Sequence, residues 1–478
     1  MSSRRCLLAL LWLPALLGGC APGPRPDAAA RDLSRLVAER AGIPVAPPAA
    51  MSEAEVRATL DDLLDQPLTA AAAMRIALLN NPEVRSIYEE LGVSRAELLG
   101  AARLPNPVLA GSVRRHPDVE HNDLELELSI ELLDVLFRPL RRGAAQAGFA
   151  AAQLRLGGAV LDLVHEVRLG FLAAQAAAET LALLRTSLAA AEASLDFAHR
   201  LHAAGNITDL DLANEQAFRE EARLAVAAAE LAERRGRERL NTLLGLWGPD
   251  TQWQLAPRLP EPPAAEPATE EIERQAVASS LDLEAARLQI EVAGRELGLA
   301  RKTRWLPELE VGGLAEREAG DKEWAVGPSI ELALPLFDQG QAAVAAAEAQ
   351  RRLREEQYRA LAIAVRAASR AARDRLAAAR QRVDYYRAVV LPLRQRIVEQ
   401  AQLQYNAMQL GAFELLAAKR DQIAAGRDYV AALHDYWQAH SDLEQVRNGR
   451  LPAGLAAGGQ MPTDPGAAPA AEPSRGGH

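Results

Sequence analysis

The chain has 478 residues, with 54 Lys or Arg against 64 Asp or Glu, so its formal net charge is −10 at pH 7. This balance argues against a nucleic-acid-binding protein, because no excess of positive charge is available to neutralise phosphates. Aromatic residues make up only 4% of the chain and Ala-rich charged stretches dominate it, which is typical of long helices rather than of several packed globular cores.

The N-terminus predicts an export signal. Arg4 and Arg5 precede an apolar run, Leu7–Leu17, which is too short to span a membrane but has the length of a signal-peptide core. The run ends in Leu-Gly-Gly-Cys at Cys20, which resembles a bacterial lipobox, and the following Ala21 implies an outer-membrane destination. We therefore expect residues 1–19 to be a signal peptide and Cys20 to carry a lipid. A plain secretory signal with an incidental cysteine is the alternative.

Proline-rich stretches divide the rest of the chain. The segments Ala21–Ala50 and Pro452–His478 are rich in Pro, Ala or Gly and are interpreted as a tether and a tail. A third such stretch, Pro257–Pro267, separates two halves of similar length. The expected organisation is a lipid-anchored N-terminal segment (20–67), a first repeat (68–256), a proline-rich connector (257–268), a second repeat (269–448) and a disordered tail (449–478).

The two halves resemble each other in sequence. Leu104-Pro105 recurs as Leu306-Pro307 at an offset of 202, and Ser129–Leu132 recurs as Ser329–Leu332 at an offset of 200. The order of expected elements is also the same, with one helical stretch (68–102, then 269–303), two short alternating segments and two long helices. Matching markers in the same order indicate an internal duplication.

The helices that close each half are unusually long. Leu140–Ala204 contains no proline and would form a helix of about 98 Å. Its counterpart Gln339–Gln409 would extend about 107 Å, with a kink expected at Pro392. Frequent Ala at apolar positions suits helices that pack closely on two sides. An ordinary coiled coil would show the same periodicity.

Four short segments alternate between apolar and polar residues. The two clearest are 123–132 and 324–334, and each follows a weaker one, 108–115 and 308–314. Alternation over nine to eleven residues is typical of strands in an outer-membrane barrel, although an amphipathic sheet on a soluble core would look alike. If the apolar faces meet lipid, the lumen-facing carboxylates are Glu125, Glu127, Glu131, Glu308, Glu310 and Glu331.

Taken together, these features resemble the outer-membrane efflux family, the TolC-like channels. The resemblance covers about 68–446 and is carried by Leu104–Pro107, by Leu334–Asp338 with Gly340, by the repeat and by the lipobox. Four strands cannot close a barrel alone, because open edges are not tolerated in lipid. The resemblance implies a mainly α fold with a small β part. Three chains would each give four strands to a 12-stranded outer-membrane β-barrel and two helical hairpins to a periplasmic α-barrel.

The function implied by the resemblance is passive export. A homotrimer in outer-membrane lipid would be the exit duct for an inner-membrane pump and a periplasmic adaptor, with metal cations or drugs as cargo and no cofactor. A lipid-anchored adaptor or structural coiled coil is the alternative. Motifs for serine hydrolases, phosphate-binding loops and HExxH metal helices are absent from the sequence, so no enzyme is expected. His116 and His121 could bind a metal, but a polar hairpin loop accounts for them, and no metal site is expected.

The resemblance also implies where the helical hairpins turn. In the family, a Tyr-x-x-Gly-like turn precedes a Leu-x-Ala signature, and Leu416–Ala418 anchors that signature in the second half. This places Met408, after Tyr405, where the family has glycine, so the turn could shift to Gly411. The first half has Gly205 at an offset of 203. We expect Gly205, Met408 and Gly411 to contact the adaptor.

Six residues beyond each turn position the sequence carries an acid, Asp211 in the first half and Glu414 in the second. The family resemblance implies that these carboxylates form a pore gate. A carboxylate in the first turn of a helix also stabilises its N-terminus by about 0.3–1 kcal/mol without any gate. Both interpretations of the two residues remain open.

Overall fold

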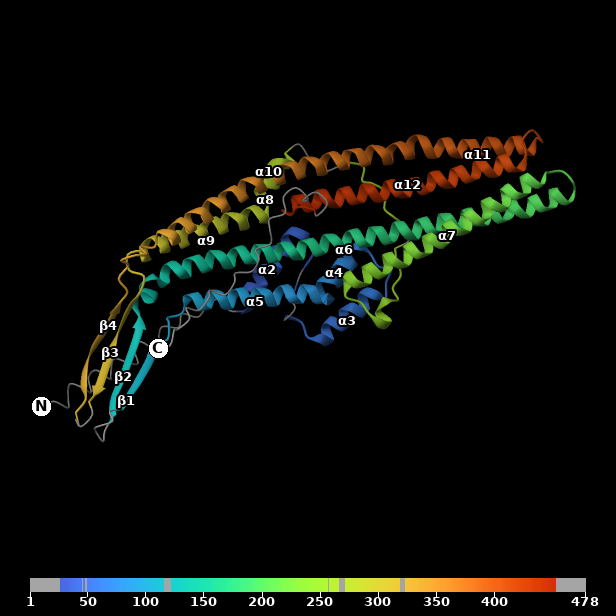
Figure 1. Cartoon of the computed structure of the whole chain (residues 1–478). Coiled ribbons are helices and arrows are strands. Elements are labelled where there is room, and N and C mark those ends of the chain that lie inside the picture. The colour runs from blue at the N-terminus through green and yellow to red at the C-terminus, as the bar shows by residue number, and fades with distance from the viewer. Residues whose placement is uncertain are drawn as a thin grey trace. The chain divides into compact units, whose positions relative to one another are not determined.

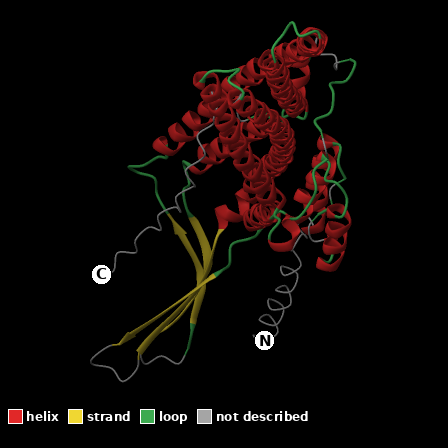
Figure 2. Cartoon of the chain, turned by 90° about the vertical axis from the view of Figure 1, so that its right-hand side faces the viewer, coloured by secondary structure: helices red, strands yellow, loops and turns green. Residues whose placement is uncertain are grey.

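The computed structural model describes residues 26–44, 46–47, 50–115, 122–256, 258–265, 271–318 and 323–452. The expected signal peptide, Cys20, the loop with His116 and His121, and nearly all of the expected tail lie outside the described residues. The described chain is mainly helical with one four-stranded antiparallel sheet (Figures 1 and 2). The expected mainly α fold with long helical hairpins and four strands is therefore confirmed.

The elements follow the same order in both halves of the chain. In chain order they are α2 (Pro26–Ala41), α3 (Glu53–Leu64), α4 (Ala70–Asn80), α5 (Pro82–Ala102), β1 (Val108–Arg115), β2 (Asn122–Glu131), α6 (Leu132–Ala203), α7 (Asp209–Leu244), η3 (Gly248–Thr251), α8 (Ile272–Ser279), α9 (Leu281–Thr303), β3 (Leu309–Arg317), β4 (Ala325–Leu332), α10 (Gln341–Tyr385), the π segment η4 (Tyr386–Val390), α11 (Leu391–Asn406) and α12 (Ala412–Arg447). Each half contains a pair of shorter helices, two strands and a long helical hairpin.

The chain divides into two compact units, each made from both halves. The first comprises residues 1–33, 88–156 and 282–360 and contains the whole sheet. The second comprises residues 34–87, 157–281 and 361–478 and contains both hairpin turns.

The sheet of the first unit has the strand order β1-β2-β3-β4. The central pair β2 and β3 joins the two halves, from Leu124 opposite Arg317 to Glu131 opposite Glu310. β1 and β4 are the edges, and neither has a further partner among the described strands. The expected third strand, 308–314, was too short, because the alternation continues through the less regular residues up to Arg317.

The long helices differ from the expectation at their starts. α6 begins at Leu132, directly after β2 and eight residues before the expected start at Leu140. Pro139 therefore lies inside the helix, where it removes one main-chain hydrogen bond. The side chain of Arg141 donates to the backbone carbonyl of Asp134, two turns earlier and directly before Val135, whose carbonyl loses its donor at the proline.

The expected kink at Pro392 is a π segment. η4 ends two residues before this proline, and the N–H of Leu391 donates to the carbonyl of Tyr386, five residues back. Because proline has no N–H to donate and its ring crowds the preceding turn, the wider π turn before Pro392 lets the helix continue from α10 into α11.

Two expected helices are each divided in two. The stretch 68–102 breaks at Asn81, because the extended backbone that Pro82 favours in the residue before it ends α4. The Asn81 side chain then accepts the N–H of Glu83 at 2.7 Å and starts α5. The second stretch, 269–303, breaks at Ser280, which is also extended although no proline follows it.

The expected N-terminal tether is wrong for most of its length. Residues 26–41 form the helix α2, in which Ala29, Leu33 and Val37 are buried. These three residues are spaced four apart, so they form a narrow apolar stripe in a segment whose other residues, apart from Leu36, are polar or small.

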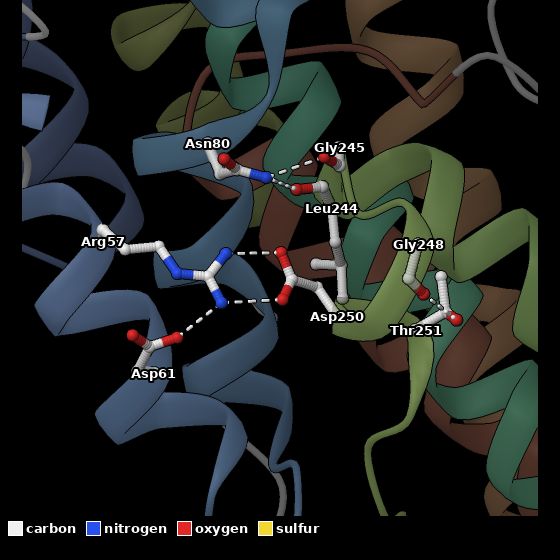
Figure 3. A network of polar contacts seen from close by, with 8 residues as sticks. All are labelled: Arg57, Asp61, Asn80, Leu244, Gly245, Gly248, Asp250 and Thr251. Atoms are coloured by element: carbon white, nitrogen blue, oxygen red, sulfur yellow. Dashed lines mark hydrogen bonds and ion pairs between the residues drawn. The ribbon is translucent and has the colours of Figure 1, made fainter.

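In the second unit, polar side chains fix α3 and α4 to the end of α7 (Figure 3). The Asn80 amide donates to the carbonyls of Leu244 and Gly245, at 3.1 and 2.7 Å. Gly245 has φ +67°, and an added Cβ would lie 3.0 Å from the carbonyl oxygen of Asn80, so glycine is required there. Arg57 contacts both carboxylate oxygens of Asp250, at 2.6 and 2.8 Å.

Part of the proline-rich connector is held by side chains of the long helices. Gln175 of α6 donates to the carbonyls of Ala256 and Arg258, and Trp437 of α12 donates to that of Pro260 at 2.7 Å. Tyr429 donates to Glu261 at 2.7 Å, and burial together with this carboxylate raises the pKa of the phenol. The described part of the connector, residues 258–265, therefore has a defined path although it forms no helix or strand.

Ser441, His165 and Asp442 form a buried polar cluster between α6 and α12. His165 Nδ1 lies 3.1 Å from the Ser441 hydroxyl, and His165 Nε2 lies 3.2 Å from Asp442, which also accepts from Arg375 of α10 at 3.2 Å. Only 2% of Ser441 is exposed, so a substrate has no access to its hydroxyl. The cluster resembles a catalytic triad in composition but satisfies its own polar atoms within the helix packing.

Candidate functional site

The register of the sheet separates its residues into two faces. The side chains on one face are almost all apolar: Leu109, Val113, Leu124, Leu126, Leu128, Ile130, Leu309, Val311, Ala315, Val326, Pro328, Ile330 and Leu332. Many of these side chains are largely exposed, including Leu109 (71%), Val326 (77%) and Ile330 (72%). A continuous exposed apolar face of this extent requires an apolar partner.

The opposite face carries the carboxylates expected from the sequence. Glu125, Glu127, Glu131, Glu310 and Glu331 lie on it with Ser112, Ser129 and Ser329. Glu308 immediately precedes β3, two residues before Glu310. The structure therefore brings the six predicted residues to one face or to its end, where they face away from the apolar side chains.

Two further carboxylates on this face were missed, Asp123 opposite Arg114 in the β1–β2 pairing and Glu316 in β3. Glu316 lies directly opposite Glu125 in the β2–β3 pairing. The sequence carries the signal, because Glu308, Glu310 and Glu316 share the same parity, but the expected strand ended at Leu314.

Three of the carboxylates already accept hydrogen bonds. Glu125 accepts from the Ser112 hydroxyl at 3.0 Å and from Arg114 at 3.2 Å, so an arginine of the same face partly neutralises it. Glu310 accepts from Ser129 at 2.9 Å. Glu131 accepts the backbone N–H groups of Leu133 and Leu309, at 3.1 and 3.2 Å, and so connects the starts of α6 and β3.

Acidic charge is concentrated at the helix end of the sheet. Glu131, Glu310 and Glu331 lie directly opposite one another on β2, β3 and β4, an arrangement of like charges that destabilises a sheet. Carboxylate oxygens of Glu131, Glu308 and Glu310 lie within 4.8 Å of one another, close enough to share a divalent cation. Exposed acidic groups often lie this close without a metal, so the observation defines a negative region rather than a metal site.

A glycine allows the strands to approach at the middle of this face. An added Cβ on Gly312 would lie 2.8 Å from the Ser329 hydroxyl and 3.0 Å from the Cα of Ser129. Gly312 lies opposite both serines in the register. A side chain at this position would force β2 and β4 away from β3.

The two hairpin turns have the same backbone structure. In the first, the N–H of Gly205 donates to the His202 carbonyl and that of Asn206 to the Leu201 carbonyl, each at 2.9 Å. In the second, Met408 donates to Tyr405 at 3.0 Å and Gln409 to Gln404 at 2.9 Å. The corresponding residues of the two turns differ by 203 in every bond, and both patterns are the Schellman motif that ends a helix.

Met408 therefore occupies the glycine position, and the turn does not shift to Gly411. Its φ is +61°, close to the +75° of Gly205, and Met408 alone among the described non-glycine residues has a positive φ. A side chain in this left-handed conformation costs about 1–2 kcal/mol. The Met408 side chain is 96% exposed, so local packing does not offset this cost.

The residues that begin the returning helices also correspond. Thr208 caps α7: its hydroxyl accepts the N–H of Asp211 at 3.1 Å, and the Asp211 carboxylate accepts from the Thr208 N–H and hydroxyl. These bonds to the Thr208 hydroxyl and N–H lower the pKa of Asp211. This reciprocal arrangement is a capping box.

In the second hairpin Gly411 caps α12 and offers no side chain to the helix. Glu414 occupies the position equivalent to Asp211, is exposed, and lies so close to Gly411 that a Cβ there would collide with its carboxylate. Asp211 therefore has a helix-capping role in the structure, whereas Glu414 has no corresponding threonine partner. Gly205, Met408 and Gly411 all lie at the turns, as expected.

Comparison with known proteins defines the class. The model of the family described as "Outer membrane efflux protein" matches residues 73–246 and 273–449, which is most of the chain and both of its halves. The chain belongs to this family of outer-membrane efflux proteins.

Several relatives are similar over most of their length. The cobalt-zinc-cadmium resistance protein CzcC of Cupriavidus metallidurans is 26% identical over 360 residues, which cover 74% of this chain and 84% of CzcC. The outer membrane protein OprJ of Pseudomonas aeruginosa is 27% identical over 360 residues, 70% of this chain and 72% of OprJ.

Solved structures share the fold. The CmeC outer membrane channel of Campylobacter jejuni has a TM-score of 0.67 at 19% identity and is covered over 87% of its chain, with 83% of this one. CusC has a TM-score of 0.65 at 17% identity, with 91% of its chain and 79% of this one covered. The TolC-like fold expected from the sequence is therefore confirmed.

Proposed function

We propose that this protein is the outer-membrane exit channel of a tripartite efflux system. The observation that carries the proposal is the sheet with one exposed apolar face, one acidic face and two unpaired edges, β1 and β4. Lipid does not hydrogen-bond to a strand edge, so these edges require strands from other copies of the chain. Three copies with four strands each would close a barrel of twelve.

The dimensions of the elements support a spanning role. β2 has ten residues, and with a barrel tilt of about 40° it would cover roughly 25 Å, the height of the apolar band of an outer-membrane barrel. α6 has 72 residues and is about 108 Å long, sufficient for a periplasmic extension. An inner-membrane pump would supply the energy and an adaptor would contact the hairpin turns, so transport through this chain would be passive.

Planar-bilayer recording tests the proposal directly. The purified full-length protein should be a trimer by native mass spectrometry and should give discrete conductance steps. The alternative function, a lipid-anchored adaptor or structural coiled coil, predicts binding to membranes without conductance. A monomeric protein that does not conduct would contradict the channel.

The polar face supports conduction of cations. Each protomer would contribute the six predicted carboxylates, with Asp123 and Glu316 in addition, to the lumen of the trimer. Arg114 offsets part of this charge through its ion pair with Glu125. Rings of carboxylates favour cations in a pore. Reversal potentials should show that the channel prefers cations. The double variant Glu310→Gln with Glu331→Gln should reduce this preference, whereas the control Arg114→Gln should not. Anion preference in the unmodified protein would contradict an acidic lumen.

Metal cations are the favoured cargo, with drugs as the second candidate. The acidic face and the similarity to a cobalt-zinc-cadmium resistance protein favour metals, while the similarity to OprJ leaves drug export open. Deletion of the gene should lower resistance to divalent metals more than resistance to drugs. The reverse result would favour the second candidate.

The lipid anchor at Cys20 is proposed from the sequence alone. Mass spectrometry of the mature protein should find an acylated cysteine at its N-terminus. A mature N-terminus elsewhere, or an unmodified Cys20, would show that the segment is a plain secretory signal.

A gate at the hairpin turns is also a proposal. Asp211 and Glu414 would converge near the tunnel axis of a trimer, bind cations and narrow the entrance until an adaptor separates the turns. Both acids are exposed, but the Asp211 carboxylate is engaged by Thr208 and Glu414 lacks a capping partner of this kind, which favours Glu414 over Asp211 as the gate.

A further inference from the structure

β3 and β4 adjoin α9 and α10 at one end of the sheet (Figure 1), and several side chains at this junction are exposed. We call this group of side chains the junction patch and define it as Lys302, Arg304, Trp305, Leu336 and Phe337. The last turn of α9, which carries Lys302, and two linkers form it, 304–308 between α9 and β3 and 333–340 between β4 and α10. The two linkers lie side by side, because the N–H of Ala333 donates to the Glu308 carbonyl at 3.4 Å and a Cβ on Gly340 would come within 3.0 Å of the Arg304 Cα.

The apolar part of the patch adjoins the end of the apolar face of the sheet. Ile330 and Leu332 lie on that face in β4, and Leu334 (66% exposed) and Leu336 (71% exposed) follow directly, where the N–H of Leu336 donates to the Leu334 carbonyl at 2.8 Å and turns the chain. Phe337 is 98% exposed and Trp305 is 61% exposed. Side chains of this size are costly to leave in water, so the patch requires an apolar environment like that of the strands.

Neither cation of the patch, Lys302 or Arg304, forms an ion pair among the described residues, although the two linkers also carry the carboxylates of Glu308 and Asp338. Lys302 is exposed and makes no ion pair within the described part of the chain, although its neighbour Arg301 pairs with Glu348 at 2.6 Å. The Arg304 guanidinium lies 4.5 Å from the Trp305 ring centre, and its Nε is buried without a hydrogen-bond partner among the described atoms. The neighbouring carboxylate of Asp338 accepts the N–H of Gly340 at 2.8 Å.

Comparable pairs bracket the apolar face at both ends. At the opposite end of the sheet, Arg317 lies 5.4 Å from the ring centre of Trp324, which directly precedes β4. The first half repeats part of the patch, because Leu136-Phe137 corresponds to Leu336-Phe337 at an offset of 200 and Leu136 is 64% exposed. Tryptophan with arginine at the limits of an apolar band is typical of the boundary between lipid tails and headgroups.

We propose that the junction patch binds the headgroup of an anionic phospholipid in the periplasmic leaflet of the outer membrane. Lys302 and Arg304 donate to the phosphate, while Trp305, Leu336 and Phe337 contact the glycerol region and the upper acyl chain. The site rests on the proposed membrane function and adds a lipid preference to it. Charge complementarity and continuity with the apolar strand face favour a phospholipid over a protein partner.

Fluorescence quenching by brominated lipids tests this site in the full-length trimer. Vesicles contain phosphatidylcholine with a minor fraction of phosphatidylglycerol, and bromine is placed near the ester bonds of one lipid at a time. The signal of Trp305 is the difference between the unmodified protein and Trp305→Phe. We expect brominated phosphatidylglycerol to quench it several-fold more than its mole fraction allows, since each interfacial cation enriches anionic lipid roughly fivefold.

Three variants identify the residues responsible. Lys302→Gln should lower the enrichment and Lys302→Gln with Arg304→Gln should abolish it, while the matched control Lys419→Gln, an exposed lysine of α12, should leave it unchanged. Because Lys302 is exposed and unpaired, Lys302→Gln should leave the structure intact. It therefore reports on lipid enrichment even if loss of Arg304 disturbs the linker.

The possible failures are distinguishable. Quenching by both lipids in proportion to their mole fractions would overturn the headgroup site while leaving membrane insertion intact. Absence of quenching by either lipid, together with absence of conductance, would overturn the proposed function as well. Enrichment that persists in the double variant would also contradict the site.

Discussion

The two hairpin turns of the second unit have the same backbone but different chemistry. Gly205 and Met408 both adopt the left-handed conformation within identical hydrogen-bond patterns. The first turn combines glycine with a capping box at Thr208, whereas the second has a strained methionine and an uncapped Gly411. The two turns therefore share the path of the chain, while the second lacks two sources of local stability that the first has.

This difference indicates a division of roles. A well-capped turn is rigid, and an acid used for capping is less available to bind ions. The second turn is less stable by about 1–2 kcal/mol from Met408 alone, and Glu414 is free of a threonine partner. We expect the second hairpin to open more readily and to carry the ion-dependent behaviour.

The largest expected effect separates the two acids. Glu414→Ala should raise the resting conductance and weaken block by divalent cations, because it removes carboxylates that would converge in the trimer. Asp211→Ala should have less effect, since its carboxylate is engaged by Thr208. Single-channel recording with added Mg²⁺ measures both quantities. If the double variant conducts and is blocked like the unmodified protein, both residues are helix caps only.

Exchange of the two turn residues tests the cost of strain. Gly205→Met should destabilise the first turn by about 1–2 kcal/mol, and Met408→Gly should stabilise the second by a similar amount, because only glycine adopts this conformation without steric cost. Hydrogen exchange at the amides of Asn206 and Gln409 reports on the two turns separately. Equal changes of the same sign in both turns would contradict the assignment.

Removal of the threonine cap should reduce the difference in stability between the two hairpin turns. Thr208→Ala deletes the hydroxyl that accepts the Asp211 N–H and should cost about 1 kcal/mol. Faster exchange is expected in the first turn of α7 only, with the first turn of α12 as an internal control. Unchanged exchange in α7 would mean that the capping box contributes little.

The smallest expected effect is on pH dependence. The pKa of Asp211 is lowered in the folded protein from its ordinary value of 3.8, so its contribution to stability is present above that pH. The contribution is lost as the pH falls through the lowered value. Exchange measured from pH 5 downward, corrected for the intrinsic rate, should show the first turn losing protection relative to Thr208→Ala. Parallel profiles for the two proteins would contradict this linkage.

Much of the fold could be predicted because its signals are local. The alternation of apolar and polar residues predicted the four strands to within a few residues. The offset of 203 between Gly205 and Met408, close to the offsets of the other repeated markers, located both turns. The predicted helices were wrong where the local composition suggested a loop but the spacing of the apolar residues suited a helix. The Ala- and Pro-rich segment concealed α2, whose buried Leu33 and Val37 are one helical turn apart, and Pro139 obscured the start of α6.

The sequence by itself determined which residues alternate, where the helices turn and which positions bear acids, because these depend on the periods of a strand and a helix. Only the tertiary structure decided that β2 pairs with β3. That pairing aligns Glu131, Glu310 and Glu331, sets Glu316 opposite Glu125 and makes Gly312 necessary. Strand register is a contact between segments almost two hundred residues apart, so no local pattern encodes it.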